Sequence, residues 1–221
     1  MSFTNSQQAL ARWLHGIGAV SFGAFRLKLH ETNPNAPLSP VYFNLRTSNN
    51  PKPGPLVQEL VKAIGRELYL LARGRKLDFT TVGGIPNAGD PLADAFVAAS
   101  GNQYPAPVRF GKMVDGDKRW VSDPITKNYV PGDIVLFIDD LVTHADTKLE
   151  AIKVARERLM TVNDMVVLID REQGGAAELA KHNCRLHAVF PLTELLDFYV
   201  REEMVSEKLA SEVLDYLKAD S

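Results

Sequence analysis

Residues 133–147 read Asp-Ile-Val-Leu-Phe-Ile-Asp-Asp-Leu-Val-Thr-His-Ala-Asp-Thr. The apolar run 134–138 is followed at once by two carboxylates, Asp139 and Asp140. Such a run predicts a strand buried on both faces of a parallel sheet, and open α/β sheets bind ligands beyond the carboxyl ends of their strands. The two acids could hold ribose hydroxyls or a hydrated Mg²⁺, or they could simply end the strand and cap the next helix. The turn that follows could point backbone N–H groups at a phosphate.

Strand-like and helix-like segments alternate along most of the chain. We expect helices at 5–15, 56–73, 91–99, 147–160, 176–182, 192–200 and 206–217. We expect strands at 20–22, 41–43, 79–83, 107–111, 134–138, 165–169 and 186–190. This alternation predicts an α/β fold with a parallel, doubly wound sheet. The polar segment 112–129 predicts a long mobile loop of the kind that often closes over a site.

Composition narrows the class of protein. The chain has 221 residues, of which 45% are hydrophobic and 24% charged, as in an ordinary globular protein. The net charge of −2 gives no support to a general nucleic-acid or membrane-surface role. A single cysteine, Cys184, excludes an intrachain disulfide and suits a reducing compartment. No signal peptide or transmembrane stretch is visible, so we expect a soluble, cytoplasmic protein.

Two further predicted strands end in residues that suit a ligand. Glycines in the segment 83–89 would let a bound group approach the backbone closely, although an ordinary turn would look the same. Arg171, which follows the strand at 165–169, could bind a carboxylate or a pyrimidine carbonyl, or could pair with Asp170 or Glu172. Because neighbouring parallel strands open at one rim, we expect these loops and residues 139–147 to share a crevice. No histidine or cysteine spacing indicates a zinc site.

These motifs together resemble the orotate phosphoribosyltransferase family, most closely the version that forms the N-terminal half of animal UMP synthase. The resemblance extends from about residue 8 over nearly the whole chain and rests on segments 17–28, 39–46, 84–93, 131–147 and 170–187. It implies a type I phosphoribosyltransferase fold in a single domain, 1–221. The core sheet would span 55–190, and residues 1–50 with the C-terminal helices would form a small hood.

The resemblance also implies an activity. The family makes orotidine 5′-monophosphate and pyrophosphate from orotate and phosphoribosyl pyrophosphate (PRPP), in the de novo synthesis of UMP. Mg²⁺ would be the cofactor, bound through PRPP and not held by the protein alone. The partners would be orotate, PRPP and a second copy of the chain, because a flexible loop from the neighbouring subunit completes the family's site.

Roles follow from the resemblance position by position. Asp139 and Asp140 fall where the family holds the ribose hydroxyls, and Arg109 and Lys112 fall where catalytic charge meets the pyrophosphate. The implied substrate-binding residues are Lys28, Phe43, Thr143, Ala145, Thr147 and Arg171. The turn 143–147 would cradle the 5′-phosphate. The implied pyrophosphate loop contains Gly84, Asn87, Ala88 and Gly89.

The departures from the family fall on the parts that bind anions. The family's lid usually begins Arg-Lys-Glu-x-Lys-Asp, whereas here Phe110 and Met113 replace two lysines. The phosphate turn carries His144 and Asp146, where small residues are usual. At ~5 Å and an effective dielectric of ~20, the charge of Asp146 would repel a phosphate by on the order of 3 kcal/mol, or roughly 100-fold in affinity.

Two functions therefore fit the sequence. In the first, the chain is a working transferase whose lid draws its charge from Arg109, Lys112, Lys118 and Arg119. In the second, it is a catalytically weak or inactive relative that binds orotate or a nucleotide. The retained Asp139, Asp140 and Arg171 favour the first. We expect Asn at both acids to abolish PRPP binding with little loss of fold, since their carboxylates would lie at an exposed rim. A regulatory module that senses PRPP would normally bring a DNA-binding segment, and none is visible. The sequence leaves open the base specificity and whether a separate decarboxylase partner exists.

Overall fold

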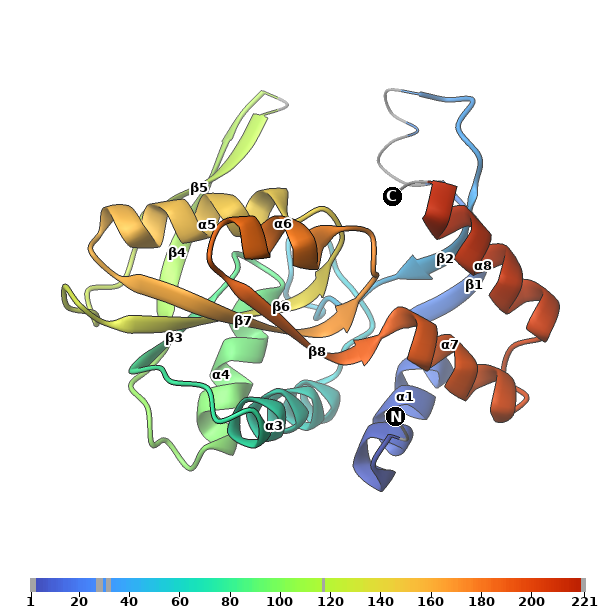
Figure 1. Cartoon of the computed structure of the whole chain (residues 1–221), viewed down its shortest axis with the longest axis horizontal. Helices are drawn as coiled ribbons and strands as arrows, with labels where there is room; N and C mark the ends of the chain where they lie inside the picture. The colour runs from blue at the N-terminus through green and yellow to red at the C-terminus, as the bar shows by residue number, and fades with distance from the viewer. Residues whose placement is uncertain (1–2, 27–29, 31–32, 117, 220–221) are drawn as a thin grey trace.

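A six-stranded sheet forms the centre of the structure, a computed structural model that describes residues 3–26, 30, 33–116 and 118–219. Its strands are β3 (Thr81–Gly84), β4 (Val108–Asp115), β5 (Lys118–Pro124), β6 (Ile134–Val142), β7 (Thr161–Asp170) and β8 (Arg185–Pro191). They lie in the order β5-β4-β3-β6-β7-β8, and all neighbours are parallel except β4 and β5 (Figure 1). The parallel α/β sheet predicted from the sequence is confirmed.

Helices cover both faces of this sheet (Figure 1). One face carries α3 (Gln58–Gly74) and α4 (Gly89–Ala99), and the other carries α5 (Asp146–Glu157) and α6 (Gly175–Lys181). The position of β6 between the two helical layers explains its apolar run. Leu136 and Ile138 belong to the core with α3 and α4, whereas Val135 and Phe137 belong to the core with α5. A strand buried on two faces has no polar side to alternate.

The N-terminal helix and strands and the C-terminal helices lie together beside β8 (Figure 1). The N-terminal part comprises α1 (Asn5–Gly16) and the antiparallel pair β1 (Val20–Phe25) and β2 (Ser39–Phe43). The C-terminal part comprises α7 (Leu192–Arg201) and α8 (Glu207–Ala219). The buried hydroxyl of Tyr199 on α7 donates to the carbonyl of Ala11 on α1 at 2.9 Å. This packing brings β2 next to the carboxyl end of the central sheet.

The segment 112–129 is not the long loop that its composition predicted. Strand β4 continues to Asp115, turns, and pairs with β5 as an antiparallel hairpin that projects past α5 (Figure 1). Val121 anchors the hairpin, because its side chain is buried and its N–H donates to Glu150 Oε2 of α5 at 3.1 Å.

Among the described residues, no helix combines the length and apolar composition needed to cross a membrane.

Candidate active site

Asp139 and Asp140 lie inside β6, which extends four residues past its predicted end. The strand continues because Leu141 and Val142 are apolar again and pair with β7. Asp139 is only 2% exposed; its Oδ1 accepts the N–H of Asp140 at 2.9 Å, and its Oδ2 lies 2.8 Å from Lys148 Nζ. The expectation that both carboxylates sit at an exposed rim is therefore wrong, since Asp139 is buried and ion-paired. Asp140 is half-buried, and its Oδ1 accepts the N–H of Leu141 at 2.7 Å.

Burial and neighbouring charges shift the pKa values of Asp140 and Lys148. Burial, together with the charge of Asp139, raises the pKa of Asp140 to about 8, although Lys148 opposes the rise. Burial alone would lower the pKa of Lys148, but the charges of Asp139 and Asp140 outweigh it and the pKa is raised. Lys148 is therefore a cation, and the two acids together carry less than two negative charges at neutral pH.

The predicted phosphate turn, 143–147, connects β6 to the first turn of α5. Ala145, at the helix N-cap, is buried and holds the left-handed φ of 73°, which costs a residue with a Cβ roughly 1–2 kcal/mol. Gly175 presses on this turn, because a Cβ there would lie 2.3 Å from the carbonyl oxygen of Thr143. The side chains of His144 and Asp146 are exposed. The first turn of α5 thus offers helix N-terminal N–H groups, which favour anions in general, on a tightly held backbone.

The predicted pyrophosphate loop is a tight turn between β3 and α4. A Cβ on Gly84 would lie 2.7 Å from the Cα of Asp90, and one on Gly89 would lie 2.3 Å from the carbonyl oxygen of Ile138. Asn87 has a φ of 78° and donates its N–H to Asp90 Oδ2 at 3.3 Å. This turn contains all four predicted loop residues, Gly84, Asn87, Ala88 and Gly89. Close approach to α4 therefore accounts for Gly84, and close approach to β6 accounts for Gly89.

Arg109 reaches this loop, but its charge is already matched. Its Nη1 donates to the carbonyl oxygen of Asp90 at 2.9 Å and to Asp90 Oδ1 at 3.1 Å, and its Nη2 pairs with the carboxylate of Asp94. Burial opposes a charge here, yet the two acids outweigh it and raise the pKa of Arg109. Sequence reasoning missed both acids, since nothing in their spacing from Arg109 signals the contact.

Phe110 and Met113, which replace two lysines of the family's lid, lie in different environments. Phe110 is buried, and its ring centroid lies 5.2 Å from that of Phe137 in the core. Met113 is 49% exposed on the hairpin, and Lys112 is also exposed. The side chains of Lys118 and Arg119 lie outside the part of the chain that the structure describes.

Two predicted base-contacting residues, distant in sequence, are brought together. The guanidinium carbon of Arg171, after β7, lies 5.6 Å from the ring centroid of Phe43, at the end of β2. The neighbouring acids contact backbone groups: Asp170 Oδ1 accepts the N–H of Glu172 at 2.8 Å, and Glu172 Oε2 accepts that of Thr193 at 2.7 Å. Lys28, the other predicted contact, lies outside the described residues.

Sequence reasoning also missed Lys148, whose ion pair with Asp139 is the main electrostatic feature of the rim. No residue pattern signals that this helical lysine turns back toward the strand. Within the described ranges, no three His, Cys, Asp or Glu side chains are grouped so that they could hold a metal ion.

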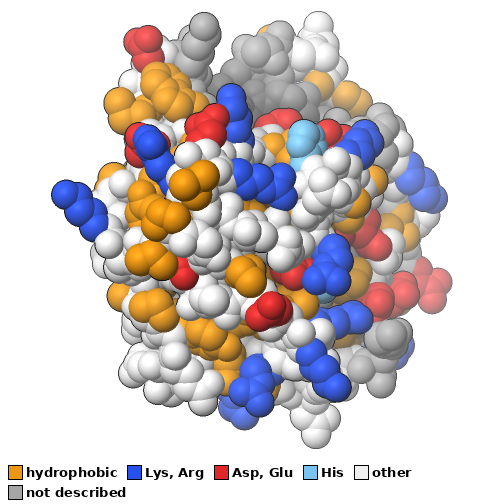
Figure 2. Space-filling model, turned by 60° about the vertical axis from the view of Figure 1, so that its left-hand side comes forward, with side chains coloured by type: hydrophobic (Ala, Val, Ile, Leu, Met, Phe, Trp, Pro, Cys, Tyr) orange, Lys and Arg blue, Asp and Glu red, His pale blue; other side chains and the backbone are white. Residues whose placement is uncertain are grey.

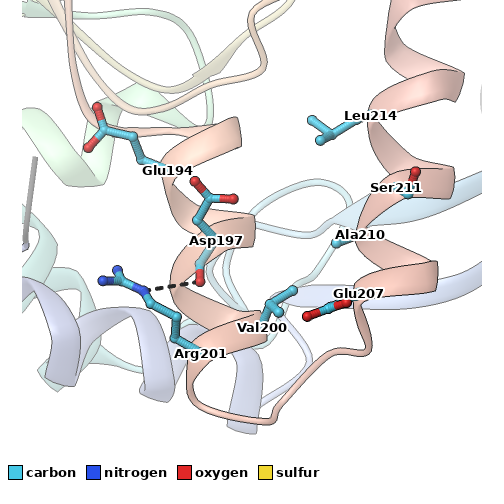
Figure 3. Close-up of a pocket in the computed structure, with 8 residues that line it drawn as sticks. All are labelled: Glu194, Asp197, Val200, Arg201, Glu207, Ala210, Ser211 and Leu214. Atoms are coloured by element: carbon cyan, nitrogen blue, oxygen red, sulfur yellow. Dashed lines mark hydrogen bonds between the residues drawn. The ribbon is translucent and has the colours of Figure 1, made fainter.

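A separate cleft lies between α7 and α8 (Figure 3). Asp197, Arg201 and Glu207 line it, and Arg201 Nε donates to the carbonyl oxygen of Asp197 at 3.3 Å. It contains none of the residues predicted for the site, several of which lie instead at the carboxyl ends of β3, β6 and β7.

Comparisons with known proteins identify the family and the fold. No family model matches the chain. It is 29% identical to a UMP synthase of Bos taurus over 96% of this chain and 41% of the relative, so it spans about two fifths of that protein. It is 31% identical to an orotate phosphoribosyltransferase of Aquifex aeolicus over 60% of this chain and 72% of the relative. The crystal structure of orotate phosphoribosyltransferase from Aeropyrum pernix superposes with a TM-score of 0.64 at 26% identity, covering 85% of this chain and 96% of that one.

The parallel sheet with its phosphate turn after β6 defines a type I phosphoribosyltransferase fold. Within that class, the chain belongs to the orotate phosphoribosyltransferase family.

Proposed function

We propose that this chain transfers the phosphoribosyl group of PRPP to orotate, giving orotidine 5′-monophosphate and pyrophosphate in pyrimidine biosynthesis. One observation carries the proposal. The acid pair of β6, the phosphate turn that follows it, the glycine loop after β3 and the Phe43–Arg171 contact meet at one rim. A ribose phosphate with a base on one side and a pyrophosphate on the other would match that order of groups.

In the proposed reaction, a ring nitrogen of orotate gives up its proton and bonds to C1 of the ribose. The bond from C1 to pyrophosphate breaks, and pyrophosphate leaves with the electron pair. Asp139 and Asp140 would form hydrogen bonds with the ribose hydroxyls, and the negative charge of the pair would favour the positive charge that develops on the ring. Arg171 would orient orotate over Phe43, and the N–H groups of the turn 143–147 would hold the 5′-phosphate.

Mg²⁺ enters the proposal only with the donor. Three of the four acid-pair oxygens already contact Lys148 Nζ or a backbone N–H, so the pair does not fit an octahedral ion held by the protein. Bound to the pyrophosphate of PRPP, Mg²⁺ would neutralise charge on the leaving group.

The test is a steady-state assay that follows loss of orotate and release of pyrophosphate with PRPP and Mg²⁺. We expect turnover that depends on both substrates. Measurable orotate binding without turnover would contradict a transferase.

The pairing of Arg109 with Asp90 and Asp94 favours a second candidate, a weak or inactive relative that binds orotate or its nucleotide. An arginine balanced by two acids offers little net attraction for pyrophosphate. Calorimetric titration with orotate, orotidine 5′-monophosphate and PRPP separates the two. Nucleotide binding much tighter than PRPP binding supports the second candidate.

We also propose that the chain forms a homodimer through its hairpin, and that it acts in the cytoplasm, as its composition predicts. Met113, Val114 and Trp120 of the hairpin are 49%, 61% and 40% exposed, and apolar side chains interrupt the charged surface on this side of the molecule (Figure 2). Exposed apolar groups of this kind favour association. Light scattering should show a dimer that serine at these three positions weakens; an unchanged dimer would place the interface elsewhere.

A further inference from the structure

Lys148 occupies a position that a surface lysine would not take. It lies in the first turn of α5, yet its side chain is only 14% exposed and reaches back to Asp139 of β6. The buried residues of α5 are Ala151, Ile152 and Ala155, so the packing of the helix does not depend on Lys148. Burying an ammonium and a carboxylate together carries a large desolvation cost, which makes the pair a weak device for stability alone.

The ion pair of Lys148 and Asp139 lies where the proposed function would bind a negatively charged ribose phosphate. The 5′-phosphate of a bound ribose would lie near the negative charge of this acid pair, and like charges in a water-poor site repel strongly. Some cation has to offset them. Lys148 already contacts Asp139, and an ammonium has three N–H donors, so further donors can reach a ribose hydroxyl.

We propose that Lys148 is a built-in cation that takes the place of a divalent ion at the acid pair, so that this site holds ribose 5′-phosphates without a metal on its carboxylates. The proposal rests on the proposed function, because it assumes that the acid pair binds the ribose. It deepens that function by assigning Lys148 as a contact residue for the sugar.

The test uses orotidine 5′-monophosphate, which has the ribose and phosphate but no pyrophosphate to bring Mg²⁺. Calorimetry in Mg²⁺ and in EDTA should give the same affinity for the wild type. Lys148→Met should lose roughly tenfold or more in EDTA, and Mg²⁺ should restore much of that loss because the freed carboxylates can take the ion. Lys148→Arg should behave as the wild type does.

Two controls separate this role from a structural one. Lys153→Met removes an exposed lysine from the same helix and should change nothing. Orotate affinity, which we assign to Phe43 and Arg171, should survive in Lys148→Met. A loss of nucleotide affinity that is equal with and without Mg²⁺, or no loss at all, would overturn the proposal.

A direct metal titration keeps the proposal testable even if Lys148→Met does not fold. Mn²⁺ alone, followed by its electron paramagnetic resonance signal, should not bind the acid pair of the wild type. Tight Mn²⁺ binding that Asp139→Asn abolishes would overturn the role of Lys148. If the wild type binds neither nucleotide nor PRPP, the proposed function itself fails; if it binds both but Lys148→Met matches it, only this inference fails.

Discussion

The two ends of the rim at the carboxyl edge of the sheet differ in the sign of the charge that is neutralised. At the end that we propose for the ribose, a lysine neutralises an acid that the family motif would leave negative, since Lys148 lies 2.8 Å from Asp139. At the end that we propose for pyrophosphate, acids neutralise a cation that the motif would leave positive, since Arg109 contacts Asp90 and Asp94. The motif residues are thus retained at both ends, but their partners reduce the electrostatic field that these residues produce. The charge of a site follows from the partners of its motif residues as well as from the motif.

The largest effect should come from breaking the ribose end. Asp139→Asn leaves Lys148 buried without its carboxylate, and breaking a buried pair on one side costs about 3 kcal/mol or more. We expect urea denaturation to show that loss, along with loss of nucleotide binding. Asp140→Asn is the control, because the pKa of Asp140 is already raised and its neutral form is the one that burial favours. Equal stability of the two variants would show that the Lys148 contact contributes little.

A second large effect concerns pH. Because burial and Asp139 raise the pKa of Asp140 to about 8, the folded state keeps a proton that the unfolded chain loses near pH 4. Folding stability should therefore fall as pH rises between about 4 and 8, by at most about 1.4 kcal/mol per pH unit from this group. Urea midpoints across that range measure the slope. Asp140→Asn should flatten it, and a slope unchanged in that variant would assign the effect to other groups.

Breaking the base contact should have a smaller and more selective effect. Arg171→Ala removes a guanidinium that lies over Phe43, and we expect orotate to bind more weakly by about 2 kcal/mol, or roughly 30-fold. PRPP should lose much less affinity. Arg75→Ala, an exposed arginine at the end of α3, is the matched control. Equal losses for orotate and PRPP would show that Arg171 orders the site instead of contacting the base.

The order of elements could be predicted because local apolar patterns decide it. Val135 and Phe137 pack on one face of β6 while Leu136 and Ile138 pack on the other, so a continuous run was sufficient to identify a central strand. The hairpin could not be predicted in this way. Its polar residues carry no strong alternation, and the contact that anchors Val121 comes from Glu150 on a distant helix.

The sequence predicts which residues belong to the candidate site, but it does not predict their electrostatic partners. A charge inside a buried strand is rare unless it is paired, so the sequence predicts that β6 ends before Asp139. Its partner, Lys148, lies on the next helix, and only the angle at which that helix meets the strand brings the two together. The pairing of Arg109 with Asp94 depends in the same way on how α4 packs beside β4.

The smallest effect should come from restoring charge at the pyrophosphate end. Asp94→Asn removes one of the two acids that balance Arg109, and Met113→Lys returns a lysine to an exposed position of the lid. Because both sites are largely exposed and screened, we expect each change to raise pyrophosphate and PRPP affinity by only about threefold. The control is Asp78→Asn, which changes an exposed acid just before the N-terminal end of β3 and should leave both affinities unchanged. Titration with pyrophosphate measures the gain in affinity. If the turnover of PRPP rises by the same factor, missing positive charge at this end is what limits the reaction. Tighter pyrophosphate binding without faster turnover would instead mean that this end of the rim no longer serves the reaction.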